Sequence, residues 1–106
     1  MVTIDVFRDA AGAIAGFSVI GHANTAPRGK DIVCAGVAAL TQTAVLGLER
    51  HLGRDFDLDL GSGKLILKLK ESPDALTGAI LETMLLGLAE IEKQSPHSVR
   101  ITEHRR

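Results

Sequence analysis

The sequence is poor in several residue types on which many classes of protein depend. It contains one cysteine, no tryptophan and no tyrosine, and aromatic residues make up only 3% of the chain. A single cysteine cannot form an internal disulfide, which is typical of proteins from a reducing compartment, so we expect a cytoplasmic protein. Because aromatic rings are scarce, the core must be built from leucine, isoleucine, valine and alanine.

The sequence also lacks an excess of charge of either sign. Twelve basic and thirteen acidic residues give a net charge of −1. No basic field is present to hold a nucleic-acid backbone, and few aromatic side chains are available for bases to stack on. We read no secretory signal at the start of the chain and no apolar run long enough to span a bilayer. We therefore expect neither a direct nucleic-acid partner nor a membrane partner.

What remains is enough material for one small domain. A length of 106 residues is typical of a single domain, and 45% hydrophobic content can fill a modest core. Alternating apolar and polar residues predict strands, and Val2, Ile4 and Val6 show the pattern of a half-buried one. The predicted strands span residues 2–8, 13–20, 56–60, 64–70 and 99–103. Short glycine-containing turns join the first two strands and the next two into hairpins, and residues 104–106 are expected to fray.

Helical periodicity predicts a helix after each hairpin. The first spans residues 32–52 and is apolar nearly all round, a pattern typical of a helix covered on both sides. We interpret Ser72 and Pro73 as the N-cap and the first residue of the second helix. The resulting order, ββαββαβ, predicts an α+β fold, a two-layer sandwich of one mostly antiparallel sheet with two helices. The second helix or a second subunit would cover the outer side of the first helix.

The residues with the most evident chemistry lie between positions 21 and 40. Asp31 has the features of a helix N-cap, whose carboxylate can accept hydrogen bonds from the second and third backbone N–H groups of the helix. Cys34 then lies in the first helical turn, where unpaired N–H groups and the helix dipole favour negative charge. His22 follows an apolar run and can sit at a strand end facing this helix start. We interpret Cys34 as a nucleophile and His22 as its general base, with the N–H groups of Cys34 and Ala35 as oxyanion donors.

Other interpretations of these two residues stay open at this point. A lone cysteine in an apolar helix is often a small buried hydrophobe, and a lone histidine near a turn is often a surface residue. A metal site is weakly supported, because the cysteine and the four histidines show no ligand spacing. A redox sensor is possible, but the chain has no resolving cysteine. Nothing in the sequence implies a cofactor.

A sequence motif extends this interpretation. Residues 21–23 read G-H-A, and after a polar segment residues 29–40 read G-K-D-I-V-C-A-G-V-A-A-L. This pattern resembles the signature of the ribosomal-processing cysteine proteases (Prp), and the resemblance covers the whole chain in length and in the order of elements. It implies that His22 and Cys34 are the catalytic pair and that residues 1–106 form a single cysteine protease domain. It also implies a homodimer, formed through the helices, that removes the N-terminal extension of a large-subunit ribosomal protein by cutting after an aromatic residue.

The chain departs from the expected family pattern at one position, since Ala38 stands where we expect a serine four residues after the cysteine. A serine would lie one turn from the thiol, so its loss can alter local hydrogen bonding or substrate contacts. The segment between the histidine and the cysteine is expected to be mobile and to admit and cover a peptide. Its predicted substrate-contacting residues are Gly21, Ala23, Asn24, Arg28 and Gly29. A competing hypothesis is a non-catalytic dimeric module of ribosome assembly, which would bind a peptide here while Cys34 only packs.

Overall fold

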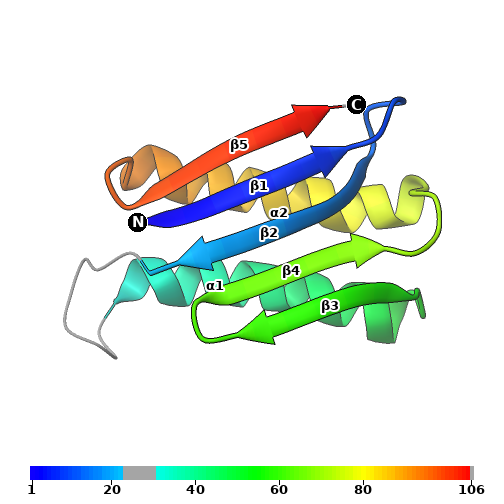
Figure 1. Ribbon diagram of the computed structural model, residues 1–106, viewed down its shortest axis with the longest axis horizontal. Helices are drawn as coiled ribbons and strands as arrows, with labels where there is room; N and C mark the ends of the chain where they lie inside the picture. The colour runs from blue at the N-terminus through cyan, green and yellow to red at the C-terminus, as the bar shows by residue number, and fades with distance from the viewer. Residues whose placement is uncertain (23–30, 106) are drawn as a thin grey trace.

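The computed structural model describes residues 1–22 and 31–105, and Figure 1 shows how their strands and helices are arranged. The elements are β1 (Val2–Arg8), β2 (Ile14–Gly21), α1 (Ile32–Leu46), η1 (Gly47–His51), β3 (Phe56–Gly61), β4 (Lys64–Leu69), α2 (Ala75–Gln94) and β5 (Val99–Arg105). The predicted order of strands and helices, ββαββαβ, is confirmed.

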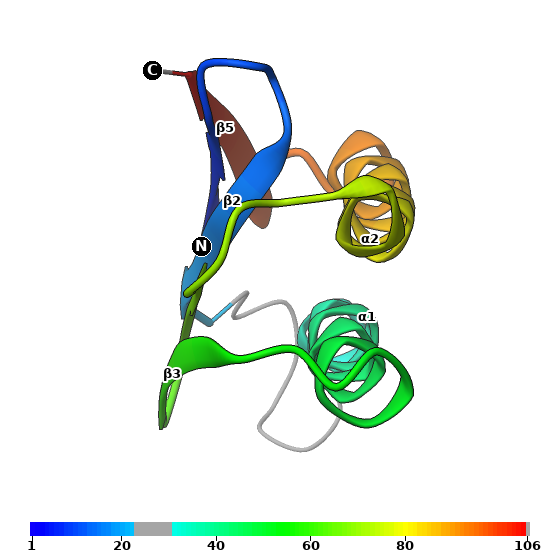
Figure 2. The ribbon, with the colours of Figure 1, turned by 90° about the vertical axis from the view of Figure 1, so that its right-hand side faces the viewer.

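The strands form one sheet in the order β3-β4-β2-β1-β5. Neighbouring strands are antiparallel except for β1 and β5, which are parallel. Figure 2 shows that α1 and α2 both lie against the same face of this sheet. The predicted α+β sandwich with a mostly antiparallel sheet is therefore confirmed. A sheet covered on one side needs apolar side chains on that side only, which explains the alternation along the strands.

The core lies between the sheet and the two helices. The buried apolar side chains of the strands are Val2, Ile4, Val6, Ile14, Phe17, Leu65, Leu67, Leu69 and Val99. Those of the helical segments are Val37, Ala44, Leu48, Leu81, Met84, Leu85 and Leu88. Each large side chain buried in this way contributes roughly 1.5–3 kcal/mol relative to its exposed state. Among the residues that the structure describes, Phe17 is the aromatic member of this buried core, and the other members are aliphatic side chains and Met84.

The two helices pack against each other in antiparallel fashion. Gly36 of α1 lies against Ile91 of α2, and Gly87 of α2 lies against Leu40 of α1. A Cβ atom at Gly87 would meet the Leu40 side chain at 2.9 Å. Glycine at these positions thus lets the helices approach closely, and it places the first turn of α1 beside the last turns of α2.

The first helical segment differs from its prediction in two respects. The regular α-helix ends at Leu46, and the chain continues as one π-helical segment in which the Leu52 N–H donates to the Gly47 carbonyl at 3.0 Å. Of the two covers predicted for the outer side of this helix, α2 does not provide one in the single chain, since Ile32 is 83% and Leu46 is 43% exposed. The second helix covers only one side of α1, so the outer side of the helical layer faces solvent in the single chain.

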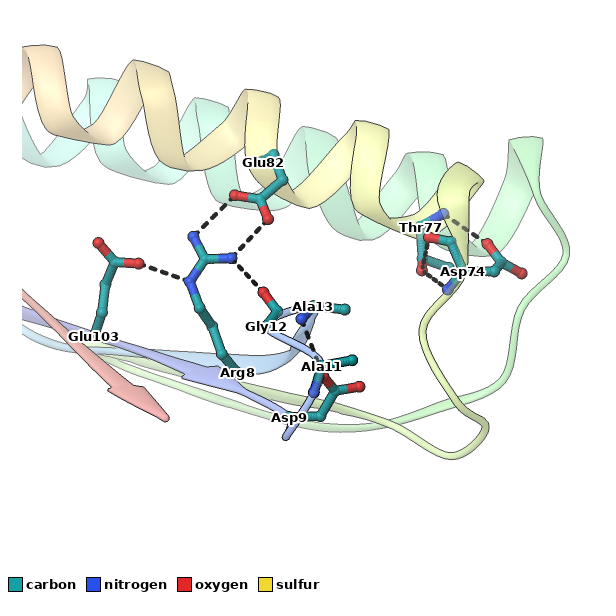
Figure 3. Close-up of polar contacts among 9 residues, drawn as sticks. All are labelled: Arg8, Asp9, Ala11, Gly12, Ala13, Asp74, Thr77, Glu82 and Glu103. Carbon is teal, nitrogen blue, oxygen red and sulfur yellow. Dashed lines mark hydrogen bonds and ion pairs between the residues drawn. The ribbon is translucent and has the colours of Figure 1, made fainter. Parts of the chain in front are cut away.

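The start of the second helix corrects the prediction at Ser72 and Pro73. The N-cap is Asp74, whose carboxylate accepts from the N–H groups of Leu76 and Thr77, each at 3.0 Å. The Thr77 hydroxyl in turn accepts from the Asp74 N–H at 2.9 Å, which completes the capping box drawn in Figure 3. A carboxylate that serves two N–H groups is a better cap than the serine two residues earlier.

The end of the chain and the apolar stretch of α1 require two further corrections. His104 and Arg105 belong to β5 and pair with β1, so they are not frayed. The helical stretch Ile32–His51 is long and apolar enough to cross a membrane by length and composition, contrary to our expectation. Core helices of soluble proteins meet the same criterion. Here Val37, Ala44 and Leu48 from this stretch are part of the core.

Candidate active site

The start of α1 holds Cys34 in a defined place. Asp31 is the N-cap, with extended backbone at φ −83° and ψ 97°, and its Oδ1 accepts from the Cys34 N–H at 3.0 Å. The predicted cap is therefore present. Cys34 is half-buried in the first turn of the helix, so its thiol lies near the positive end of the helix dipole.

The end of β2 holds His22. Gly21 precedes it with φ +102°, and a Cβ atom there would lie 2.3 Å from the Met1 carbonyl oxygen. Only glycine satisfies both conditions, since other residues rarely adopt this φ and the obstructing atom belongs to the backbone. The His22 carbonyl accepts from the Met1 amino nitrogen at 2.6 Å. These contacts hold the backbone on either side of the histidine, while its side chain is exposed.

One pocket of about 210 Å³ brings the two residues together. His22 and Cys34 both line it, from the end of β2 and from the first turn of α1. Apolar side chains such as Val37, Leu60 and Leu65 form much of the remaining wall. A thiol and an imidazole in one pocket with apolar walls are groups that acyl transfer from a peptide bond can use.

Of the other predicted site residues, some line the pocket, some do not, and some lie outside the described residues. Gly21 lines the pocket with His22 and Cys34, whereas Ala35 is exposed on α1 and does not line it. The Ala35 N–H donates to the Asp31 carbonyl at 3.1 Å, within the helix. The predicted loop residues Ala23, Asn24, Arg28 and Gly29 lie outside the residues that the structure describes.

Sequence reasoning missed several residues of the pocket wall. Val37, Thr41 and Gln42 line it and follow Cys34 by three, seven and eight positions, so helical spacing alone would have found them. Ala38, which the sequence motif had already singled out one turn from the thiol, lines the pocket as well. Thr41 is buried, and its hydroxyl donates to the Val37 carbonyl at 2.8 Å.

The β3–β4 hairpin supplies another part of the wall, including Leu60, Gly61 and Gly63. Its presence there depends on the pairing of β4 with β2. No local sequence signal reveals that pairing, so the hairpin's contribution to the pocket was not predictable from the residues alone.

Within residues 1–22 and 31–105, no three histidine, cysteine, aspartate or glutamate side chains are grouped so as to hold a metal ion. The thiol of Cys34 and the imidazole of His22 both line the pocket.

Comparisons with known proteins point to one family. A family model described as the cysteine protease Prp matches residues 1–100. The ribosomal processing cysteine protease Prp of Bacillus subtilis is 33% identical over 108 residues, covering 96% of each chain. The protein of the same name from Staphylococcus aureus is 29% identical over 104 residues, covering 95% of this chain and 97% of its own.

Solved structures agree with the sequence comparisons. The crystal structure of the ribosomal processing protease Prp from S. aureus with a covalently linked product peptide superposes with a TM-score of 0.93. Sequence identity is 25%, and the match covers 98% of this chain and 100% of the other. A second crystal structure of the S. aureus protein, with a substrate peptide, has a TM-score of 0.87 at 24% identity and the same coverage, which supports the fold.

Proposed function

Because the chain belongs to the family of the cysteine protease Prp, we propose that it cleaves its substrate with Cys34 as nucleophile and His22 as general base. The observation that carries the proposal is the pocket that these two side chains share. Cysteine protease chemistry is the activity of the family. The assignment of roles to these two residues rests on their chemistry and on their position at the helix start and the strand end.

The reaction follows from the chemistry of the two groups. His22 takes the proton of the Cys34 thiol, and the sulfur attacks the carbonyl carbon of the scissile peptide bond. The protonated imidazole then gives its proton to the leaving amine, so the amine product departs and a thioester remains on Cys34. Water, deprotonated by His22, attacks the thioester and releases the carboxylate product and the thiol.

The start of α1 supplies the environment for the negatively charged intermediate. The tetrahedral oxygen forms beside Cys34, where the positive end of the helix dipole favours negative charge. The N–H groups of Cys34 and Ala35 already donate to the carboxylate and the carbonyl of Asp31. As oxyanion donors they would have to share these hydrogen bonds, so we assign the larger part of the stabilisation to the helix end as a whole.

The proposed substrate is a large-subunit ribosomal protein that carries an N-terminal extension, cut after an aromatic residue. This proposal is supported by the relatives, which are named as ribosomal processing proteases. We further propose that Ala23, Asn24, Arg28 and Gly29 contact the peptide, because they connect His22 to Asp31 in the sequence. The alternative of a non-catalytic peptide-binding module is not favoured, since the S. aureus protein was crystallised with a covalently linked product peptide.

We propose that the enzyme works in the cytoplasm as a homodimer formed through the helices, without a nucleic-acid or membrane partner. The outer side of the helical layer carries the large apolar side chains Ile32, Leu46, Leu76 and Leu86, which are 43–83% exposed. Large apolar side chains exposed on one side of a molecule are typical of a contact surface.

The proposed function is tested by incubating the purified chain with an N-terminally extended ribosomal protein and locating the new N-terminus by mass spectrometry. We expect cleavage by the wild-type chain and a loss of at least about 10²-fold in rate for Cys34→Ala and for His22→Ala. His97→Ala is the matched control, because His97 is an exposed histidine that does not line the pocket. If cleavage persists in both pocket variants, Cys34 is not the nucleophile and His22 is not the general base.

A further inference from the structure

The turn between β3 and β4 contacts the side chain of His22. Gly63 lies in this turn with φ +66°, and a Cβ atom on it would meet Nε2 of His22 at 2.6 Å. The same Cβ would lie 3.2 Å from both Cδ2 and Cε1 of the ring. The imidazole therefore lies with its Nε2 edge against the backbone of Gly63, in the space that any other residue would fill with its side chain.

Gly63 also holds the backbone that leads to the histidine. Its carbonyl accepts from the Gly21 N–H at 2.8 Å. One turn residue thus supports both the peptide before His22 and the ring of His22. The histidine is otherwise exposed at the end of β2, so the hairpin contact limits where its ring can sit.

We infer that Gly63 is a positioning residue for the base, a role that rests on the proposed function of His22. A methyl group at position 63 leaves the backbone of the pocket in place, because the obstructing atoms belong to an exposed ring that can swing away. The ring then leaves its present position in the wall of the pocket that His22 shares with Cys34. A displacement of about 1 Å is enough to lower a catalysed rate by about 10²-fold.

The chain offers a matched control for this substitution. Gly53 has nearly the same backbone conformation, φ +63°, but a Cβ atom on it would meet nothing within 4 Å. Gly63→Ala and Gly53→Ala therefore carry the same left-handed backbone strain, and only the first meets the imidazole. We expect both variants to melt at similar temperatures, each about 5 °C below the wild type.

Activity should separate the two variants. For Gly63→Ala we expect kcat for peptide cleavage to fall by about 10²-fold with little change in KM, since the substitution moves the base and leaves the apolar wall intact. For Gly53→Ala we expect both constants to stay within about twofold of the wild type. Equal losses in the two variants, or full activity in Gly63→Ala, would overturn the inference.

A second readout shows whether Gly63 acts through His22. The rate at which iodoacetamide alkylates Cys34 at neutral pH can be measured even in inactive variants. We expect Gly63→Ala to slow alkylation in the wild-type background and to have no further effect in the His22→Ala background. An equal slowing in both backgrounds would mean that the methyl group damages the pocket itself, and the positioning role would be rejected.

The two proposals fail in different ways. If His22→Ala retains cleavage, the assignment of the base is wrong, and with it the role of Gly63. If His22→Ala is inactive while Gly63→Ala is fully active, the assignment of His22 as the base is retained and only the positioning role of Gly63 is rejected.

Discussion

Asp31 and Cys34 are joined by a hydrogen bond that fixes where α1 begins relative to the pocket. The Asp31 carboxylate accepts a hydrogen bond from the Cys34 N–H at 3.0 Å, so the side chain that caps the helix also holds the backbone of the proposed nucleophile. Cap and cysteine are three positions apart, and this local relation is why both were predictable from the sequence. The contact between Gly63 and His22 joins residues far apart in the chain, and no local sequence pattern predicts it.

Replacement of the cap tests this arrangement. Asp31→Ala should destabilise the protein by about 1 kcal/mol, because the Cys34 N–H loses its side-chain acceptor. Asp31→Asn should retain most of the stability, since an asparagine side chain accepts the same hydrogen bond. Urea unfolding of both variants measures the difference, and equal losses for alanine and asparagine would show that the charge, and not the cap, is what matters.

At the scale of elements, the sequence predicted the strands and helices but misplaced some of their ends. The second helix begins one residue after Asp74, and its cap depends on the reciprocal contact with Thr77, drawn in Figure 3. Ser72 and Asp74 both have capping side chains, and only the backbone geometry selects between them. The π-helical segment Gly47–His51 was likewise unpredictable, because the widened turn has no characteristic residue in the sequence.

Two glycines of α2 should respond differently to alanine. A methyl carbon added at Gly78 would meet nothing within 4 Å, whereas one added at Gly87 would lie 2.9 Å from the Leu40 side chain. Gly78→Ala should stabilise the protein by about 0.5–1 kcal/mol through helix propensity. Gly87→Ala should give less or none of this gain, because the Leu40 side chain must move. Thermal unfolding of the two variants checks the prediction, and a larger gain at position 87 would contradict the close packing of the helices.

At the scale of the whole molecule, Arg8 connects the sheet to the helical layer. From the end of β1 it donates to both carboxylate oxygens of Glu82 in α2, at 2.7 and 2.9 Å, and to Glu103 in β5 at 2.8 Å (Figure 3). These hydrogen bonds, those to Glu82 first, raise the pKa of Arg8 above its ordinary value. The hydrogen bond from Arg8 holds the pKa of Glu82 below its ordinary value of 4.5.

This connection predicts a dependence of stability on pH. Since the pKa of Glu82 is lower in the folded protein, its contribution is present above pH 4.5 and is lost as the pH falls through the folded value. Glu82→Gln should lower stability at pH 7 by about 1 kcal/mol and make unfolding less sensitive to pH below 4.5. Glu90→Gln, at an exposed position of the same helix, should behave like the wild type. Urea unfolding at several pH values measures this, and parallel curves for Glu82→Gln and the wild type would contradict it.

The proposed dimer is also a property of the whole molecule. Leu86 is 70% exposed on the outer side of α2, and Leu86→Lys should convert the dimer to a monomer by placing a charge in the contact. Thr102→Lys, which adds the same charge at an exposed position of β5, should leave the dimer intact. Sedimentation velocity distinguishes the two states, and a dimer that survives Leu86→Lys would place the contact elsewhere.

The order of the strands in the sheet could not be predicted from the sequence. Alternation predicts which side chains of a strand are buried, as Leu65 and Leu67 show, but it does not say which strand lies beside it. The parallel pairing of β1 with β5 and the antiparallel pairing of β2 with β4 depend on contacts between distant segments. The pocket wall formed by the β3–β4 hairpin follows from that order and was therefore also missed.

The central claim, that Cys34 attacks the peptide bond, is tested most directly by intact-protein mass spectrometry of an acid-quenched cleavage reaction. The account predicts that the mass of the intact protein increases by the mass of the released N-terminal peptide minus one water. Digestion of this adduct should then locate the thioester on the fragment that contains Cys34. The adduct and the cleavage should both be absent from the Cys34→Ala variant. Cleavage that continues in this variant, which lacks the thiol, would contradict the account.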